Sequence, residues 1–175
     1  FRSEWLNTND ADKFRTWMPI GFCYDINHDD LPEIVYYKGL FDGNGHTING
    51  LYLNNKEQRD VGLFGKISEE AEIRNVGVIN SYFYGDYRIG GICVSNYGTI
   101  INSYNSSIVK SDDIAIGGVC GYNLNMITNC YYDKDKYSGN GVGNNSAEFK
   151  SWEIAFLLSQ GEKGSVWGQL IGTND

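Results

Sequence analysis

The sequence predicts an all-β fold in which the chain winds as a parallel β-helix, a solenoid of about four coils. The main support is a motif that recurs every 27 residues, as in Asn75, Asn102 and Asn129. Each period holds short β-branched and aromatic runs divided by Gly, Asn, Ser and Asp, which are strand and turn signals. No period contains the run of about ten residues with helical periodicity that a helical repeat needs. Strands that recur without intervening helices stack on their own copies, so residues one period apart become neighbours.

The repeated motif joins a Gly-containing turn to a strand that ends in Asn. Copies of the turn lie at 61–65, 89–93 and 116–121, and the strands that follow begin at Ile73, Ile100 and Ile127. Stacked coils place equivalent Asn amides above one another, where they can hydrogen-bond as a ladder. We therefore predict a structural Asn ladder of Asn75, Asn102 and Asn129. A second column is expected at Asn96 and Asn123.

Composition limits the class of protein. The 175 residues suit a single domain. The net charge of −8, with no Lys/Arg cluster, argues against a nucleic-acid partner, whose phosphates attract basic patches. No apolar run approaches the ~20 residues of a membrane span, so we expect no membrane insertion by this segment. The chain begins without Met, and we interpret it as part of a longer polypeptide.

Along the single domain, three parts are expected. Residues 1–40 form an N-terminal cap and first coil, 41–138 the repeat coils, and 139–175 a C-terminal capping helix and strand. The helix is predicted near Ser146–Ser159, because Asn145 and Glu148 resemble a capping box and the apolar residues that follow have helical spacing. A membrane-surface helix is the alternative, but its polar face lacks the Lys and Arg that this role needs.

Several segments together resemble the GLUG-repeat family: Phe41–Ile48, Gly62–Gly65, and the Ile-x-Asn-Ser/Cys-Tyr strands. That family occurs in large bacterial surface and secreted proteins, including adhesins and immunoglobulin A1 protease-type polypeptides. The resemblance covers roughly residues 17–132 and implies a right-handed β-helix outside the cell, on the bacterial surface or secreted. It implies no protease activity for this chain, which lacks His-Glu-x-x-His and has only His28 and His46 as histidines.

One acidic segment has the oxygen spacing of a calcium loop. Asp25, Asn27 and Asp29 lie two residues apart, and Glu33 is a further candidate ligand. A complete loop needs Gly at its sixth position and Glu at its twelfth, where this chain has Asp30 and Tyr36. A solvated acidic loop is therefore favoured over a calcium site, and we predict no metal and no cofactor.

A second acidic group raises the possibility of catalysis. Asp86 and Asp113 are one period apart, beside Asp112, and paired carboxylates are the catalytic groups of glycosidases. The segments 82–88 and 109–115 look like loops, however, and about four coils give only a short groove. A charged turn is favoured over a catalytic pair. Among the cysteines, Cys93 and Cys120 occupy equivalent positions, and we interpret them as buried reduced thiols rather than a disulfide.

Tyrosines supply the candidate binding residues. Tyr104 and Tyr131 are one period apart and form a column, with further candidates on nearby segments at Tyr82, Tyr84, Tyr87 and Tyr132. If the column faces outward, it can stack on sugar rings or fill a partner's pockets; if it faces inward, it is core. Two functions remain open. The favoured one is a noncatalytic extracellular adhesion, binding or stalk module, not an enzyme, with a host or matrix protein or a glycan as partner. The alternative is a carbohydrate-active β-helix enzyme, a glycoside hydrolase or lyase, that uses Asp86, Asp112 and Asp113.

Overall fold

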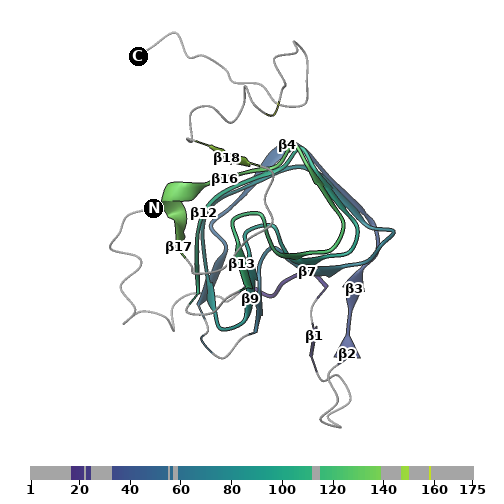
Figure 1. Cartoon of the computed structure of the whole chain (residues 1–175), viewed down its shortest axis with the longest axis horizontal. Coiled ribbons are helices and arrows are strands. Elements are labelled where there is room, and N and C mark those ends of the chain that lie inside the picture. The colour runs from purple at the N-terminus through teal and green to yellow at the C-terminus, as the bar shows by residue number, and fades with distance from the viewer. Residues whose placement is uncertain are drawn as a thin grey trace.

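The chain forms a parallel β-solenoid. The structure, a computed structural model, describes residues 17–21, 23–24, 33–54, 56, 59–111, 115–138, 147–149 and 158. Over these residues the fold is all-β, with about three turns and nearly no helix. Figure 1 shows the successive turns overlying one another around a shared outline. The predicted fold class is confirmed, whereas the fourth coil is not.

Three parallel sheets make up the walls, and each turn contributes a strand to each sheet. The four-stranded sheet contains β3 (Tyr36–Tyr37), β7 (Phe64–Ile67), β10 (Cys93–Asn96) and β14 (Cys120–Asn123). The three-stranded sheet contains β6 (Asp60–Val61), β9 (Arg88–Gly90) and β13 (Ala115–Gly117). The nine-stranded sheet contains β4 (Leu40–Asn49), β5 (Tyr52–Asn54), β8 (Glu72–Gly85), β11 (Thr99–Ile101), β12 (Tyr104–Ser111), β15 (Met126–Thr128), β16 (Tyr131–Asp133), β17 (Tyr137–Ser138) and β18 (Ala147–Phe149).

Two smaller elements complete the described residues. An antiparallel hairpin of β1 (Cys23–Tyr24) and β2 (Glu33–Ile34) extends away from the stacked turns (Figure 1). A short 3-10 helix spans Lys134–Lys136, between β16 and β17.

Strand register reproduces the period read from the sequence. Ile73, Ile100 and Ile127 are neighbours on three successive strands, because the turns that separate them have equal length. The first turn is longer, since Phe41 pairs with Ile73, 32 residues later. Its extra residues fall at a bend where the register of β4 shifts between Asp42 and His46, and where Asn44 and Gly45 have positive φ.

The Asn column forms one corner of the solenoid. Asn75, Asn102 and Asn129 have φ values of 54°, 48° and 49°, a left-handed conformation that Asn tolerates better than most residues. Asn129 Nδ2 donates to Asn102 Oδ1 at 2.7 Å, and Asn102 Nδ2 donates to Asn75 Oδ1 at 3.4 Å. In the first turn Asp42 takes the next place, accepting from Asn75 Nδ2 at 3.0 Å. The ladder therefore both turns the chain and joins the coils.

A second Asn pair and a tight glycine bend hold the other corners. Asn96 Nδ2 donates to Asn123 Oδ1 at 2.6 Å. At the bend between the three-stranded and four-stranded sheets, a Cβ on Gly117 would overlap the carbonyl oxygen of Cys120. Only glycine fits so close to the neighbouring backbone.

The core fills the interior with stacked aliphatic and aromatic side chains. Phe64, Ile73, Phe83, Ile92 and Ile100 are fully buried. The thiols of Cys93, Cys120 and Cys130 are also buried, and all three are free. Cys93 and Cys120 lie side by side in register on β10 and β14.

The C-terminal part differs from its prediction. Ala147–Phe149, expected to open the helix near Ser146–Ser159, instead forms β18 and pairs in parallel with β16. Because the last coil presents an open strand edge, backbone pairing with that edge outweighs local helical propensity. Of the remaining predicted helix the structure describes only Leu158, which is buried and whose carbonyl accepts from Asn129 Nδ2 at 3.2 Å. The capping helix is not confirmed. Among the helices described, none has the length and apolar character required to cross a bilayer.

Candidate functional site

Tyr104 and Tyr131 form an outward column on the nine-stranded sheet. The two residues are in register on β12 and β16, so their strands lie about 4.8 Å apart. Both side chains are partly exposed, and the residues flanking Tyr104, Ser103 and Asn105, are buried. Asn105 points inward, where its Nδ2 donates to the carbonyl of Gly118 at 2.8 Å. Because alternate residues of a strand face opposite sides, Tyr104 faces out.

Local contacts hold the two rings in place. The ring of Tyr104 lies across Gly77 of the preceding turn, where a Cβ would overlap it. The hydroxyl of Tyr131 donates to Asn129 Oδ1 at 2.7 Å, which ties it to the Asn ladder. Burial raises the pKa of both tyrosines, and Cys130 adds to the shift at Tyr131. Both phenols are therefore neutral at physiological pH and present a flat apolar surface with a polar edge.

Tyr132, a predicted member of the same set, faces the other way. It packs against the core, and its ring lies where a Cβ on Gly118 would be. Tyr132 is in register with Asn105 and takes the inward place that Asn105 has one turn earlier. Its assignment to the binding face is therefore corrected: the strand alternation that turns Tyr131 outward turns Tyr132 inward.

Tyr82 and Tyr84 lie beyond a bend in β8, apart from the column. Tyr82 stacks on Tyr52 with ring centroids 5.7 Å apart and an interplanar angle of 21°. Burial raises the pKa of Tyr82, with smaller contributions from Tyr52 and Tyr84. The Nζ of Lys56 lies 5.6 Å from the centroid of Tyr84. Sequence analysis missed Tyr52 because its partner is 30 residues away, a longer interval than the 27-residue period.

Tyr87 belongs to a third group, in which arginines alternate with rings. The guanidinium carbons of Arg59 and Arg88 lie 4.8 and 5.0 Å from the centroid of Tyr87, and Arg88 is also 4.8 Å from that of Tyr122. Such cation–π contacts contribute about 0.5–1 kcal/mol each at exposed sites. The six predicted tyrosines are thus divided among three places on the surface and one in the core.

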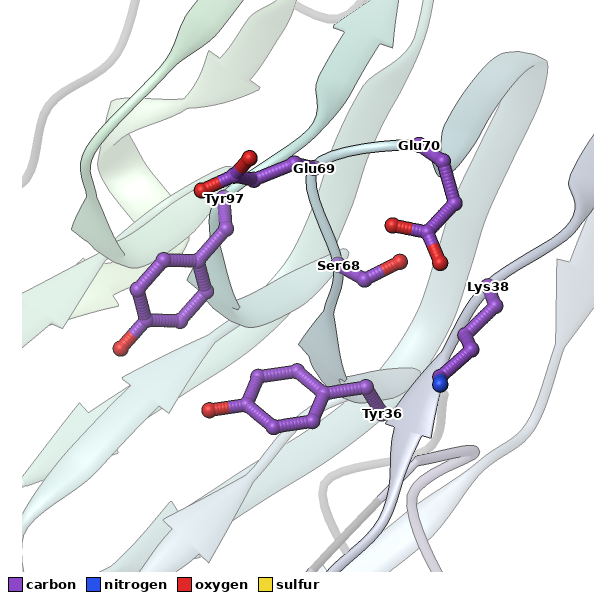
Figure 2. A pocket seen from close by; sticks show the side chains of 6 residues that line it. All are labelled: Tyr36, Lys38, Ser68, Glu69, Glu70 and Tyr97. Carbon is purple, nitrogen blue, oxygen red and sulfur yellow. The ribbon is translucent and has the colours of Figure 1, made fainter.

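A cavity lies at a different corner, where the four-stranded sheet leads into the nine-stranded sheet. Its volume is about 390 Å³, and its walls come from three successive turns: Tyr36, Lys38, Ser68, Glu69, Glu70 and Tyr97. Figure 2 shows the two tyrosines on one side, with Glu70 and Lys38 together on the other. The rings of Tyr36 and Tyr97 meet edge to face, with centroids 5.8 Å apart and an interplanar angle of 75°. The sequence offered no signal for this cavity, because its residues do not share the period.

Electrostatics distinguishes the two carboxylates of the cavity. The pKa of Glu70 lies below its ordinary value because its own backbone N–H donates to the carboxylate, with further contributions from the Ser68 hydroxyl and the positive charge of Lys38. The Ser68 hydroxyl points toward Glu70 (Figure 2) but falls outside full hydrogen-bonding geometry, and Ser68 Oγ is buried without a partner. Glu69 is exposed and forms no ion pair with the residues that the structure describes.

The catalytic and metal candidates find little in the described residues. Asp86 is exposed, and Asp112 and Asp113 lie outside the described residues. The same is true of Asp25, Asn27 and Asp29, the candidate calcium ligands, although β1 and β2 on either side of their loop are described. Within the described ranges, no group of three or more His, Cys, Asp or Glu side chains is arranged to hold a metal ion.

Comparison with known proteins gives two partial relatives. Over 111 residues, 59% of this chain, the sequence is 30% identical to Halomucin of Haloquadratum walsbyi, and the match covers 1% of that protein. Over 69 residues, 38% of this chain, it is 32% identical to a putative Gly-rich membrane protein of Evansella cellulosilytica, covering 8% of it. The chain thus spans a small fraction of both relatives. No protein-family model and no solved structure matches the chain, so the resemblance to GLUG repeats is not confirmed.

Proposed function

We propose that this chain is a noncatalytic binding module of a longer extracellular protein, with Tyr104 and Tyr131 as its contact surface. The observation that carries the proposal is the outward, in-register placement of these two rings on adjacent strands. The partner is a host or matrix protein or a glycan. A pair of parallel aromatic faces suits the apolar face of a sugar ring or an apolar side chain.

The surroundings of the column favour binding because they limit its mobility before a ligand arrives. Tyr131 is bonded to the Asn ladder, and Tyr104 rests on Gly77. A side chain that is already ordered loses less entropy on binding than a mobile one. The column therefore resembles a preorganised contact surface more closely than the scattered tyrosines elsewhere on the molecule.

The relatives support the extracellular part of the proposal. One is named a membrane protein, and the name of the other contains the word mucin. Both names are compatible with a surface location on a bacterium or another microbe, or with secretion. The small share of each relative that this chain spans also agrees with a module in a long polypeptide.

The test is a variant that removes both rings. Tyr104→Ser/Tyr131→Ser should lose most of the wild-type signal in a glycan array and in a cell-adherence assay, because both stacking surfaces are gone. Loss of one stacked ring costs about 1 kcal/mol, so removing both should weaken binding by roughly tenfold or more. A parallel assay on polysaccharides should release no reducing ends, and hydrolysis that depends on Asp86, Asp112 or Asp113 would favour the enzyme instead.

A matched control removes two tyrosines elsewhere. Tyr84→Ser/Tyr122→Ser loses the same number of rings outside the column and should bind like wild type, with both variants checked for thermal unfolding. Adherence unchanged in Tyr104→Ser/Tyr131→Ser, with an intact fold, would leave the domain as a spacer in its parent protein.

A further inference from the structure

We propose that the cavity formed by Tyr36, Tyr97, Ser68 and the two glutamates binds an alkylammonium group. The ligand class is a compact organic cation, either a quaternary ammonium or the ammonium end of a lysine side chain. This site is separate from the tyrosine column and adds a second, chemically different specificity to the binding module.

The cavity is held by backbone hydrogen bonds between turns. Ser68 N donates to the carbonyl of Tyr37 at 2.9 Å, and Tyr97 N donates to that of Ile67 at 3.2 Å. The Ser68–Ala71 turn is closed by Ala71 N, which donates to the carbonyl of Ser68 at 3.0 Å. The lining side chains therefore project from a rigid corner, and little ordering is needed when a ligand binds.

The two aromatic rings suit a cation better than a flat sugar. Tyr36 and Tyr97 stand nearly perpendicular, at 75°, so together they form two adjoining walls rather than one wide platform. A cation placed within about 6 Å of a ring centroid is attracted by the negative face of the ring. Perpendicular walls surround a compact, roughly spherical group such as a methylated ammonium.

The charges point to the same ligand class. Lys38 and Glu70 offset one another, because the positive charge of Lys38 acts on the Glu70 carboxylate. Glu69 then leaves the cavity with one net negative charge, which disfavours an anion and attracts a cation. Ser68 Oγ, buried without a partner, can accept a hydrogen bond from an ammonium N–H or a ligand hydroxyl. The volume of about 390 Å³ exceeds that of the ammonium head and leaves room for its alkyl chain.

The test compares a cation with its neutral isostere. Choline and 3,3-dimethylbutan-1-ol have nearly the same shape and differ in charge, and each is titrated into the isotopically labelled whole chain while amide NMR signals are followed. Choline should shift the amides of Glu69, Glu70, Tyr97 and Gly98 with a Kd on the order of millimolar, about tenfold or more tighter than the neutral alcohol. An N-acetyl-lysine amide in a third titration separates a primary ammonium ligand from a quaternary one, and binding of either supports the site.

Three variants give responses that a nonspecific effect would not reproduce. Glu69→Gln and Tyr97→Leu should each weaken choline binding by roughly fivefold, whereas Lys38→Gln should tighten it severalfold by removing a like charge. Tyr104→Ser, in the other site, should leave the choline Kd unchanged, so failure of the tyrosine column and failure of this cavity are distinguishable.

Three results would overturn the proposal. One is equal binding of choline and the neutral alcohol, and another is a weaker choline interaction in Lys38→Gln. The third is a methyl glycoside that binds this cavity more tightly than choline, which would assign the site to carbohydrate. Absence of binding by both ammonium probes up to about 50 mM, well above the millimolar range expected, would also reject it.

Discussion

Cys130 shows how one buried side chain connects structure to stability. Its Sγ donates to the carbonyls of Thr128 and Ile100 at 3.3 and 3.5 Å. Burial raises the pKa of this thiol from 9.0 to about 12, since the thiolate cannot be solvated in the core. The pKa of Cys93 is likewise raised by burial, in contact with Cys120. These thiols therefore behave as small apolar side chains rather than as reactive groups.

The shift at Cys130 predicts a loss of stability in alkali. Its folded pKa lies above the unfolded value, so its contribution is complete below pH 9.0 and declines as pH rises toward about 12. At about pH 10.5 the unfolded state gains roughly 2 kcal/mol from thiolate formation that the folded state lacks. Thermal unfolding at pH 8 and pH 10.5 should show a smaller alkaline decrease for Cys130→Ala than for wild type. The tyrosines titrate in the same range, so equal decreases in the two proteins would show that Cys130 remains protonated for neither reason.

At the scale of elements, the corner between β11 and β12 depends on both backbone conformation and side-chain bonding. Asn102 has positive φ and lies at the centre of the ladder, bonded to Asn75 and Asn129. The adjacent Ser103 supports the same corner, since its hydroxyl donates to the carbonyl of Ile101 and accepts from the backbone N–H of Val76. The corner is therefore a bonded stack that runs through successive coils, not an independent turn in each one.

Two substitutions at Asn102 separate these contributions. Asn102→Ala should lower the free energy of unfolding by about 1–3 kcal/mol from lost hydrogen bonds, with a further ~1 kcal/mol from the left-handed backbone. Asn102→Gly loses the same bonds but tolerates positive φ, so its loss should be smaller. Chemical denaturation measures both. An alanine variant as stable as wild type would contradict a stabilising ladder.

At the scale of the molecule, each coil contacts only the coils beside it, so a position's contribution depends on its place in the stack. Ile73, Ile100 and Ile127 occupy equivalent places in three turns. Ile100 is fully buried between its neighbours, whereas Ile127, in the last repeated turn, is only partly buried. Stability in such arrays is a sum of repeat and interface contributions.

This difference predicts unequal effects for the same substitution. Ile100→Ala should cost about 2–5 kcal/mol, the usual range for a fully buried aliphatic truncation. Ile127→Ala should cost roughly half of that or less, because less apolar surface is removed from contact. The measurement is chemical denaturation of both variants. Equal losses would indicate that the C-terminal side of the last turn is packed as tightly as the interior.

The sequence alone determined the repetitive features of this protein. The 27-residue spacing predicted the parallel stacking, the pairing of Tyr104 with Tyr131, and the alignment of the Asn residues, because a solenoid converts a constant interval into direct contact. Regular spacing is sufficient for these features, since backbone hydrogen bonds between coils depend on register more than on side-chain identity.

Only the tertiary structure decided which way side chains face and which irregular residues meet. Tyr131 and Tyr132 are adjacent and chemically identical, yet one faces outward and the other packs on the core. The period is the same for both orientations, so packing against Gly118 and the core had to select between them. Tyr36 and Tyr97 come together across turns of unequal length, a contact that no constant interval predicts. Likewise, β18 pairs with the open edge of β16 because unpaired backbone groups on that edge favour a strand over the local helical pattern.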